Sequence, residues 1–331
     1  MTTLTGDTKM ASGPGKSHRK GISLIELAEM FPTEDAAREW FEGVVWPDER
    51  CCGHCGSTRT TEASHKTMPY WCSDCRSYFS VRTGTVMERS KLPVRKWVYA
   101  IYLDLTSLKG VAAMKLHRDL GIGYRAAWFL QQRIREAFAA EGPILFGGPV
   151  EVDETYVGGL ERNKHAKDKL NAGRGPVGKT AVVGAKDRET GKVAARVIAE
   201  VDGETLNSFV DGHAEDGATV YTDGSTVYRG RENHEAVKHS IGEYVRYLEG
   251  ETVHTNGVES FWSMLKRAHK GTFHRLSAKH LQRYVNEFCG RHNIRDMDTI
   301  RQMEHVVAQM VGKRLMYRDL IADNGLSPVA S

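Results

Sequence analysis

Apolar residues recur at helical spacing through much of the first 140 residues. In residues 23–45 this spacing predicts two short helices, with a break at Phe31-Pro32 because the residue before a proline disfavours helical geometry. Residues 94–140 have a helical pattern throughout, and a Gly121-Ile122-Gly123 turn separates two of the expected helices. A helix, a short turn and a second helix are the arrangement of a helix-turn-helix, and an ordinary helical hairpin fits the same pattern.

The second helix of this pair carries polar side chains that a helix-turn-helix would turn toward DNA. In the alternative, they form only the solvated face of a hairpin. The density of Lys and Arg favours the DNA-binding interpretation, together with the cysteine pairs described below. The residues concerned are Arg125, Gln131, Gln132, Arg133 and Arg135.

From residue 148 the pattern changes to strands and helices in alternation. The first strand places Val150 and Val152 on one face and Asp153 on the other. Strands are expected near 180–186 and 193–201, then a helix near 204–213 and a strand that ends at Asp223. Three strands, a helix and a fourth strand ending in an acid are the order of an RNase H-like fold. The sequence therefore predicts an α/β domain in which Asp153 and Asp223 lie side by side.

A later helix, residues 256–267, is expected to pack on that sheet. Four apolar residues form one stripe of it: Val258, Phe261, Trp262 and Leu265. An adjoining polar stripe would face the cleft beside the aspartates and holds Asn256, Glu259, Ser263 and Lys266. Converging carboxylates bind two Mg²⁺ or Mn²⁺ ions for phosphoryl transfer, and Lys266 would hold a DNA phosphate near them.

Each member of this constellation also has a plain structural interpretation. An Asp at a strand end is often a turn former, Asn256 with Glu259 three residues later fits a capping box, and Lys266 could be a solvated charge. The joint arrangement, in this order along the chain, favours a catalytic site.

Two cysteine pairs, Cys52-Gly53-His54-Cys55 and Cys72-Ser73-Asp74-Cys75, are separated by 16 residues. This spacing is typical of a zinc ribbon with four thiolate ligands, and the alternating strand 76–82 would complete its small sheet. Disulfides belong mainly to short secreted domains, which disfavours them in a chain of 331 residues. We expect His54 at the knuckle surface, Cys51 as a bystander thiol and Cys289 as a small buried residue.

Composition adds limits without naming a partner. A chain of 331 residues with 40% hydrophobic content has room for two or three domains, and its net charge of +4 permits nucleic-acid binding without requiring it. There is no signal-peptide core and no apolar run long enough to span a membrane, so a cytoplasmic, nucleoid-associated protein is expected. The predicted division is a disordered tail (1–22), short helices (23–47), a zinc ribbon (48–90), a helix-turn-helix-like DNA-binding domain (91–142), an RNase H-like catalytic domain (148–290) and a C-terminal helical segment (291–331).

Residues 173–180 match the pattern of a phosphate-binding loop letter for letter. Such a loop follows a buried strand and opens a helix, whereas here a basic stretch precedes the motif and a strand follows it. We therefore expect no nucleotide triphosphate as a partner. The stretch instead offers a basic surface for a phosphodiester backbone, through Arg162, Lys164, Lys167, Lys169, Arg174 and Lys179.

Several blocks of this sequence resemble bacterial insertion-sequence transposases of the IS-1595-like (ISXO-2-like) group, over about residues 25–295. They are the cysteine pairs and the segments 79–86, 91–97, 153–159 (DETYVGG), 221–224 (YTDG) and 254–267 (HTNGVESFWSMLKR). The resemblance implies a zinc-ribbon and helical DNA-binding region followed by an RNase H-like integrase domain. It implies an enzyme that cuts double-stranded DNA at terminal inverted repeats and joins 3′-hydroxyl ends to target DNA, using Mg²⁺ and working as a multimer of at least two copies.

In this group the catalytic set is two aspartates, then Asn or Glu, then Lys. Asp153, Asp223 and Lys266 match it, and both Asn256 and Glu259 are candidates for the third member. Glu259 is favoured because a carboxylate binds Mg²⁺ more strongly than a neutral amide. Arg267, which closes the last block, is a further expected DNA contact. The first knuckle departs from the family's Cys-Pro-x-Cys, and residues 291–295 lack an expected aromatic residue and second Arg.

Two rival functions remain compatible with these patterns. The first is a zinc-containing transcriptional regulator that binds DNA through residues 50–140 and carries an inactive integrase-like domain. The second is an RNase H-type nuclease without strand transfer, which would cleave DNA and yield no joined products.

Overall fold

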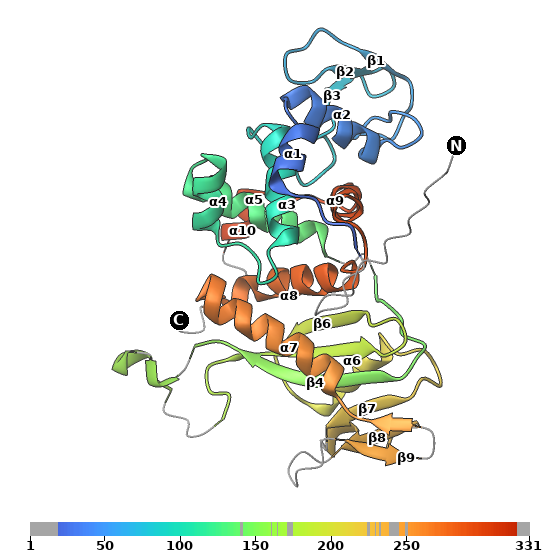
Figure 1. Cartoon of the computed structure of the whole chain (residues 1–331), viewed down its shortest axis with the longest axis vertical. Coiled ribbons are helices and arrows are strands. Elements are labelled where there is room, and N and C mark those ends of the chain that lie inside the picture. The colour runs from blue at the N-terminus through green and yellow to red at the C-terminus, as the bar shows by residue number, and fades with distance from the viewer. Residues whose placement is uncertain are drawn as a thin grey trace, which may run out of the picture.

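A computed structural model describes the chain over residues 19–139, 142–159, 161–163, 165–170, 175–223, 226–228, 230–231, 233–237, 245–248 and 251–322. A small three-stranded sheet lies at one end of the molecule and a five-stranded sheet lies toward the other, with helices between them (Figure 1). The predicted disordered tail lies largely outside the described residues. Lys20 already donates its backbone N–H to Asp298, so the ordered chain begins before residue 23.

Two short helices lead into the small sheet, as the apolar pattern predicts. Helix α1 (Leu24–Met30) begins after the N-cap Ser23, and α2 (Glu34–Val45) begins after the N-cap Thr33. Strands β1 (Thr60–Glu62), β2 (Tyr70–Cys72) and β3 (Ser77–Phe79) form an antiparallel sheet in the order β1-β2-β3. The sheet is fastened to α2 where the Tyr70 hydroxyl donates to Glu42 at 2.8 Å.

A helical region follows, made of α3 (Val94–Thr106), α4 (Ala113–Leu120) and α5 (Tyr124–Ala137). Gly121 ends α4 in the left-handed conformation, with φ of 58°, and α5 starts three residues later, so the helix–turn–helix order is present. The C-terminal helix α9 (Thr299–Ala308) packs on α2, α3 and α5. Its buried Met303 and Val306 join the same core as Trp97 and Ile101.

The C-terminal segment thus returns to the helical region and does not cover the larger sheet. Residues 298–322 form α9 and the short α10 (Tyr317–Ile321), so the predicted C-terminal helical segment is present, and the buried side chains of α9 pack in the core of the helical region. The link is reinforced where Val86 donates its backbone N–H to the Met310 carbonyl at 3.1 Å.

The larger sheet has five strands in the order β6-β5-β4-β7-β8. Its strands are β4 (Val150–Val157), β5 (Thr180–Asp187), β6 (Val193–Ile198), β7 (Val220–Asp223) and β8 (His234–Val237). The first three are antiparallel neighbours, whereas β7 runs parallel to both β4 and β8. A mixed α/β fold is therefore present, and β4 and β7 are neighbours, as the sequence predicts.

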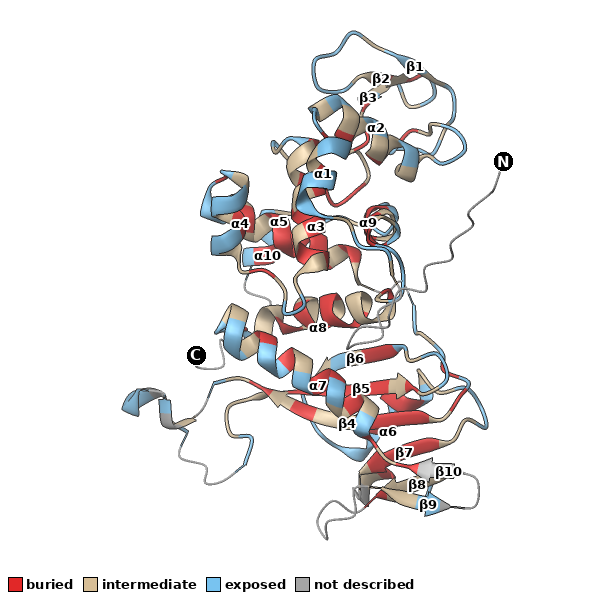
Figure 2. Ribbon diagram, in the orientation of Figure 1, coloured by how far each residue is buried: buried red, intermediate tan, exposed pale blue. Residues whose placement is uncertain are grey.

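Helices cover both faces of this sheet. Helix α6 (Gly203–Asp211) packs on one face through Leu206 and Phe209, while α7 (Asn256–Ala268) and α8 (Ala278–Asn293) lie on the other. Buried residues fill the interior strands and the inward side of α8 (Figure 2). Strands β9 (Arg246–Leu248) and β10 (Glu251–Val253) form a hairpin before α7, and a π-helical turn, His269–Phe273, follows it. Short 3₁₀ turns occupy Glu161–Asn163, Ala166–Asp168 and Thr226–Tyr228.

A buried ion pair joins the helical region to the larger sheet's helix layer. Arg135 on α5 donates from Nε to Glu287 on α8 at 2.6 Å, and the two side chains are 1% and 0% exposed. Arg291 lies 3.1 Å from the other Glu287 oxygen, and the Arg135 guanidinium stacks 3.9 Å from the centroid of the Tyr284 ring. These contacts fix α5 against α8 in a water-excluded joint.

Candidate functional site

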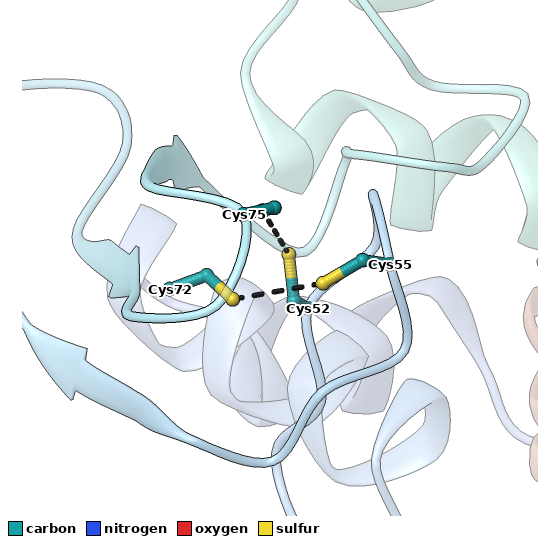
Figure 3. Close-up of side chains that lie close together, drawn as sticks. All are labelled: Cys52, Cys55, Cys72 and Cys75. Atoms are coloured by element: carbon teal, nitrogen blue, oxygen red, sulfur yellow. Dashed lines mark hydrogen bonds between the residues drawn. The ribbon is translucent and has the colours of Figure 1, made fainter.

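The four cysteines of the two pairs converge at the small sheet (Figure 3). The Cys52 sulfur lies 3.7 Å from that of Cys75, the Cys55 sulfur lies 3.7 Å from that of Cys72, and all four sulfurs lie within 4.8 Å of one another. None of these cysteines is in a disulfide, whose sulfur atoms would be about 2 Å apart. Four sulfurs gathered in this way match the tetrahedral ligand set of structural zinc.

The local environment lowers the pKa of the thiol at one of these positions and raises it at another. Backbone N–H groups, first that of Cys75, lower the pKa of the Cys72 thiol, whereas burial raises the pKa of Cys52. A bound cation would compensate for the buried charge of Cys52. His54 is exposed and Cys289 is buried, as predicted.

Close packing explains why Gly53 occupies the position in the first knuckle where we expected a proline. A Cβ on Gly53 would lie 2.2 Å from the Thr83 carbonyl oxygen, because the turn at Gly84 crosses the knuckle closely. Gly84 itself has φ of 71° and approaches the Gly53 carbonyl in turn. The departure from Cys-Pro-x-Cys is therefore matched by this close backbone crossing.

The two predicted aspartates occupy equivalent positions on neighbouring parallel strands. Strands β4 and β7 pair with Val152 opposite Thr222, so the next residues along, Asp153 and Asp223, stand beside each other. Neighbouring strands lie about 4.8 Å apart, and residues in the same register point to the same face. Both aspartates consequently lie on the face that α7 covers.

The electrostatics of Asp153 reflect this crowding. Burial, together with the nearby charges of Glu154, Asp223 and Glu259, raises the pKa of the Asp153 carboxyl to about 7. Like charges held close together disfavour ionisation of one another. A divalent cation would offset that repulsion, and oxygen-rich carboxylate sets are what Mg²⁺ and Mn²⁺ prefer.

Helix α7 brings the third acid to this face. Its apolar stripe, including Val258 and Trp262, packs on the sheet as predicted, which leaves Glu259 half-buried with Thr255 donating to its carboxylate at 3.0 Å. Asn256 is exposed and is the first helical residue, while the N-cap is Thr255, so Asn256 and Glu259 do not form the capping box considered above. Ser263 and Lys266 are exposed further along the helix.

The acidic side chains are spaced more widely than the cysteines. Among the residues that the structure describes, the four cysteines are the one group of three or more His, Cys, Asp or Glu side chains gathered closely enough to hold a metal ion, and their sulfur atoms lie within 4.8 Å of one another. Asp153, Asp223 and Glu259 share a face without reaching that closeness. Their donor chemistry fits a hard divalent cation, and their approach is sufficient for mutual electrostatic influence.

The predicted DNA contacts on α5 divide into two groups. Gln132 and Arg133 are 0% and 6% exposed, so the prediction that they reach DNA is wrong, and Gln131 and Arg135 are buried as well. The reason is tertiary: Arg133 donates to the carbonyls of Glu88 and Leu315, since the returning C-terminal segment covers this side of α5. Arg125, in the first turn of α5, is exposed.

The basic stretch between β4 and β5 is described only in part. Lys164 and Arg174 lie outside the described residues, as does the side chain of Arg162, whereas Lys167 is exposed and Lys179 is half-buried just before β5. Thr180, the last residue of the phosphate-loop pattern, begins β5 and not a helix, as we expected. Arg267, on α7, is exposed and bonds to the Ser263 carbonyl.

Two comparisons with known proteins agree with this geometry. Residues 145–293, which contain the larger sheet with α7 and α8, match the ISXO2-like transposase domain, and residues 32–78 match the transposase zinc-ribbon domain. Both matches are to domains of IS1595-type transposases. It is also 29% identical, over 80% of its own length and 92% of the other chain, to an uncharacterised protein in the transposable element ISH50 of Halobacterium salinarum. The two matched domains indicate DNA binding and an enzyme of the transposase or nuclease kind.

The structure also brings forward residues of this transposase domain that sequence patterns did not single out. Glu151 is 1% exposed and binds the N-terminus of α7, and Glu154 on the opposite face accepts a hydrogen bond from the buried Tyr228 hydroxyl. The sequence signal that could have identified Glu151 is an acid two residues before Asp153, at a position of the strand that faces inward.

No helix among the described residues is long and apolar enough to cross a membrane.

Proposed function

We propose that this chain is a DDE-type transposase that binds the terminal inverted repeats of its own element, cleaves donor DNA and joins the 3′-hydroxyl ends to target DNA. The observation that carries the proposal is the register of β4 and β7, which sets Asp153 beside Asp223 on the face covered by α7. The family match over residues 145–293 includes both aspartates and Glu259. The order of elements supports it as well, since three antiparallel strands, a helix, and then two strands parallel to the first are the order expected of the RNase H-like fold that we propose.

In this proposal Asp153, Asp223 and Glu259 hold divalent cations, Mg²⁺ or Mn²⁺. When bound, such ions activate the attacking oxygen and stabilise the leaving oxygen of an in-line phosphoryl displacement. Glu259 is the better third member than Asn256, because its charge contributes to the raised pKa of Asp153 while Asn256 is exposed at the helix start. Lys266, exposed two turns further along α7, is suited to hold a DNA phosphate.

The DNA is expected to cross from the helical region to α7. Arg125 stands at the N-terminal end of α5, which is the part of a recognition helix that contacts base edges in a helix-turn-helix. Lys167, Lys179 and Arg267 offer cations for the phosphate backbone. At least two copies are required in this scheme, since two element ends must be joined to one target.

The test is metal-dependent nicking of duplexes that carry the element's own ends. Wild-type protein with Mg²⁺ or Mn²⁺ should nick at the end of the inverted repeat and form strand-transfer products with a target plasmid. Asp153→Asn and Asp223→Asn should each lower the nicking rate by about a thousandfold or more, because each removes a metal ligand, while DNA binding is retained. Glu200→Gln, an exposed carboxylate after β6, is the matched control.

The outcomes separate the candidate functions. Nicking without joined products would indicate a nuclease and contradict strand transfer. Specific DNA binding without any nicking by the wild-type chain, at any Mg²⁺ or Mn²⁺ concentration, would contradict the enzymatic proposal and leave a DNA-binding regulator.

A further inference from the structure

Glu151 is a carboxylate buried on the same face of β4 as Asp153. Side chains alternate along a strand, so residues 151 and 153 both point toward α7. Glu151 is 1% exposed, and a buried carboxylate is stable only when its oxygens are bound by donors or cations. Each of its oxygens is in fact engaged, by two different parts of the chain.

One oxygen holds the start of α7. Oε2 of Glu151 accepts a hydrogen bond from the backbone N–H of Val258 at 2.9 Å, inside the first turn of the helix. The N-cap Thr255 makes no side-chain cap bond of its own, so a residue from the sheet supplies the acceptor that the helix end needs. The positive end of the helix dipole also favours a carboxylate at this place.

The other oxygen is tied to the turn after β5. Arg188 donates from Nε to Oε1 of Glu151 at 2.8 Å and from Nη2 to the His254 carbonyl at 2.6 Å. The Arg188 guanidinium also stacks 4.2 Å from the centroid of the Tyr221 ring on β7. Glu151 and Arg188 together therefore connect β4, β7, the residue before the N-cap and the first turn of α7.

Helix α7 comes so close to Glu151 that a glycine is required at position 257. A Cβ on Gly257 would lie 2.6 Å from Oε2 of Glu151 and 3.1 Å from the Lys186 side chain. Gly257 has no positive φ, so packing and not backbone conformation accounts for its place.

We infer that Glu151 is a positioning residue, which holds α7 at the height and rotation that turn Glu259 toward Asp153 and Asp223. Glu151 binds the backbone of Val258, and the next residue of the helix is Glu259, while Asp153 lies two residues after Glu151 on the same face of β4. A shift of α7 along the sheet by about the length of one hydrogen bond would move the Glu259 side chain away from the aspartates. This inference rests on the proposed function, because it assigns Glu259 to the cation-holding set.

The first measurement is independent of catalysis. Hydrogen–deuterium exchange of peptides spanning residues 254–262 is compared for wild type, Glu151→Gln and the exposed control Glu200→Gln. Glutamine keeps the size of the side chain but loses the charge that binds Arg188, so amides of the first turn of α7 should exchange about tenfold faster or more. Glu200→Gln should exchange as wild type does. Unchanged exchange in Glu151→Gln would overturn the inference.

The second measurement reads the metal site through the Mn²⁺ concentration that gives half-maximal nicking. Residues that orient metal ligands affect metal affinity, so Glu151→Gln should raise this midpoint by about tenfold or more. A role in stability alone would lower the nicking rate at every Mn²⁺ concentration and leave the midpoint where it is. That result would overturn the positioning role and leave the proposed function standing.

Gly257→Ala disturbs the same contact from the other side with Glu151 intact. Alanine favours a helix over glycine, so a stability defect is not expected from helix propensity, but its Cβ must displace Oε2 of Glu151. The Mn²⁺ midpoint should rise as in Glu151→Gln, and a wild-type midpoint and exchange rate would overturn the inference. If the wild-type chain itself fails to nick DNA, the proposed function falls, and the exchange experiment still decides whether Glu151 anchors α7.

Discussion

The buried ion pair between α5 and α8 allows a sharp prediction about how the helical region and the larger sheet are held together. In Arg135→Met the aliphatic length is kept, while the charge that Glu287 faces at 2.6 Å and the stacking on Tyr284 are lost. Removing one partner of a buried pair costs about 3–5 kcal/mol, because the other charge is left without compensation. Glu287 keeps a bond to Arg291 at 3.1 Å, so we expect the lower end, about 3 kcal/mol.

The assay is equilibrium unfolding in urea, followed by tryptophan fluorescence and by far-ultraviolet circular dichroism. Arg301→Met is the matched control, since Arg301 pairs with Glu304 at 2.8 Å on α9 with 76% of its side chain exposed. An exposed pair contributes about 0–1 kcal/mol. The double variant Arg135→Met/Glu287→Gln should lose about 2 kcal/mol less than the sum of its single variants, since the charge of Glu287 is then no longer left without Arg135.

The reasoning fails if Arg135→Met is no more destabilising than Arg301→Met, or if the two changes at the buried pair are additive. The joint would then be held by apolar packing alone. The shape of the unfolding transition is a second sign of coupling. With the pair intact, the unfolding curves from fluorescence and from circular dichroism should coincide. In Arg135→Met the two curves should separate, because the helical region and the larger sheet then unfold independently.

Three further predictions follow from other parts of the molecule. Chelation of zinc, or Cys72→Ser, should unfold the small sheet and abolish DNA binding while the larger sheet stays folded, as read by exchange in residues 50–80 against 150–198; retained protection of 50–80 without metal would contradict the zinc assignment. Burial raises the pKa of Asp104 to about 7 from 3.8, so the folded state holds a proton that the unfolded state has lost, and stability should fall as pH rises from about 4 to 7. In Asp104→Asn that slope should become shallower, since Asp153 with its raised pKa still contributes over the same range, and stability at pH 8 should rise on the order of 4 kcal/mol; an unchanged slope in urea titrations would contradict the prediction. Arg125→Ala should weaken binding to the element's ends with unfolding unchanged, whereas Arg133→Ala should lower the melting temperature and leave the affinity of the folded protein as it is; the reverse pattern would show that α5 presents its other face.

The local patterns were read correctly because they depend on residues close together in the chain. The cysteine spacing predicted a cluster whose sulfurs meet at 3.7 Å, and the alternation at Val150, Val152 and Asp153 predicted the two faces of β4. The apolar stripe of α7 likewise predicted which side of that helix packs on the sheet. The order of strands and helices was enough to expect the neighbours β4 and β7.

The errors arose where a distant segment covers a surface. Gln132 and Arg133 are residue types that a DNA-reading helix often carries, and Arg125 in the first turn of α5 is indeed exposed. Nothing within a few residues of Arg133 indicates that the carbonyl of Leu315, 182 positions later, accepts its hydrogen bond.

By itself, the sequence determined the four-cysteine cluster, the types and order of most elements, and the neighbouring positions of the two aspartates, since side-chain period and ligand spacing are properties of short stretches. Only the tertiary structure decided that α9 completes the helical core, that Arg133 is buried, and that Glu151 fixes α7 against the sheet. The physical reason is that burial and charge pairing depend on which surfaces meet, and those surfaces come from segments a hundred or more residues apart.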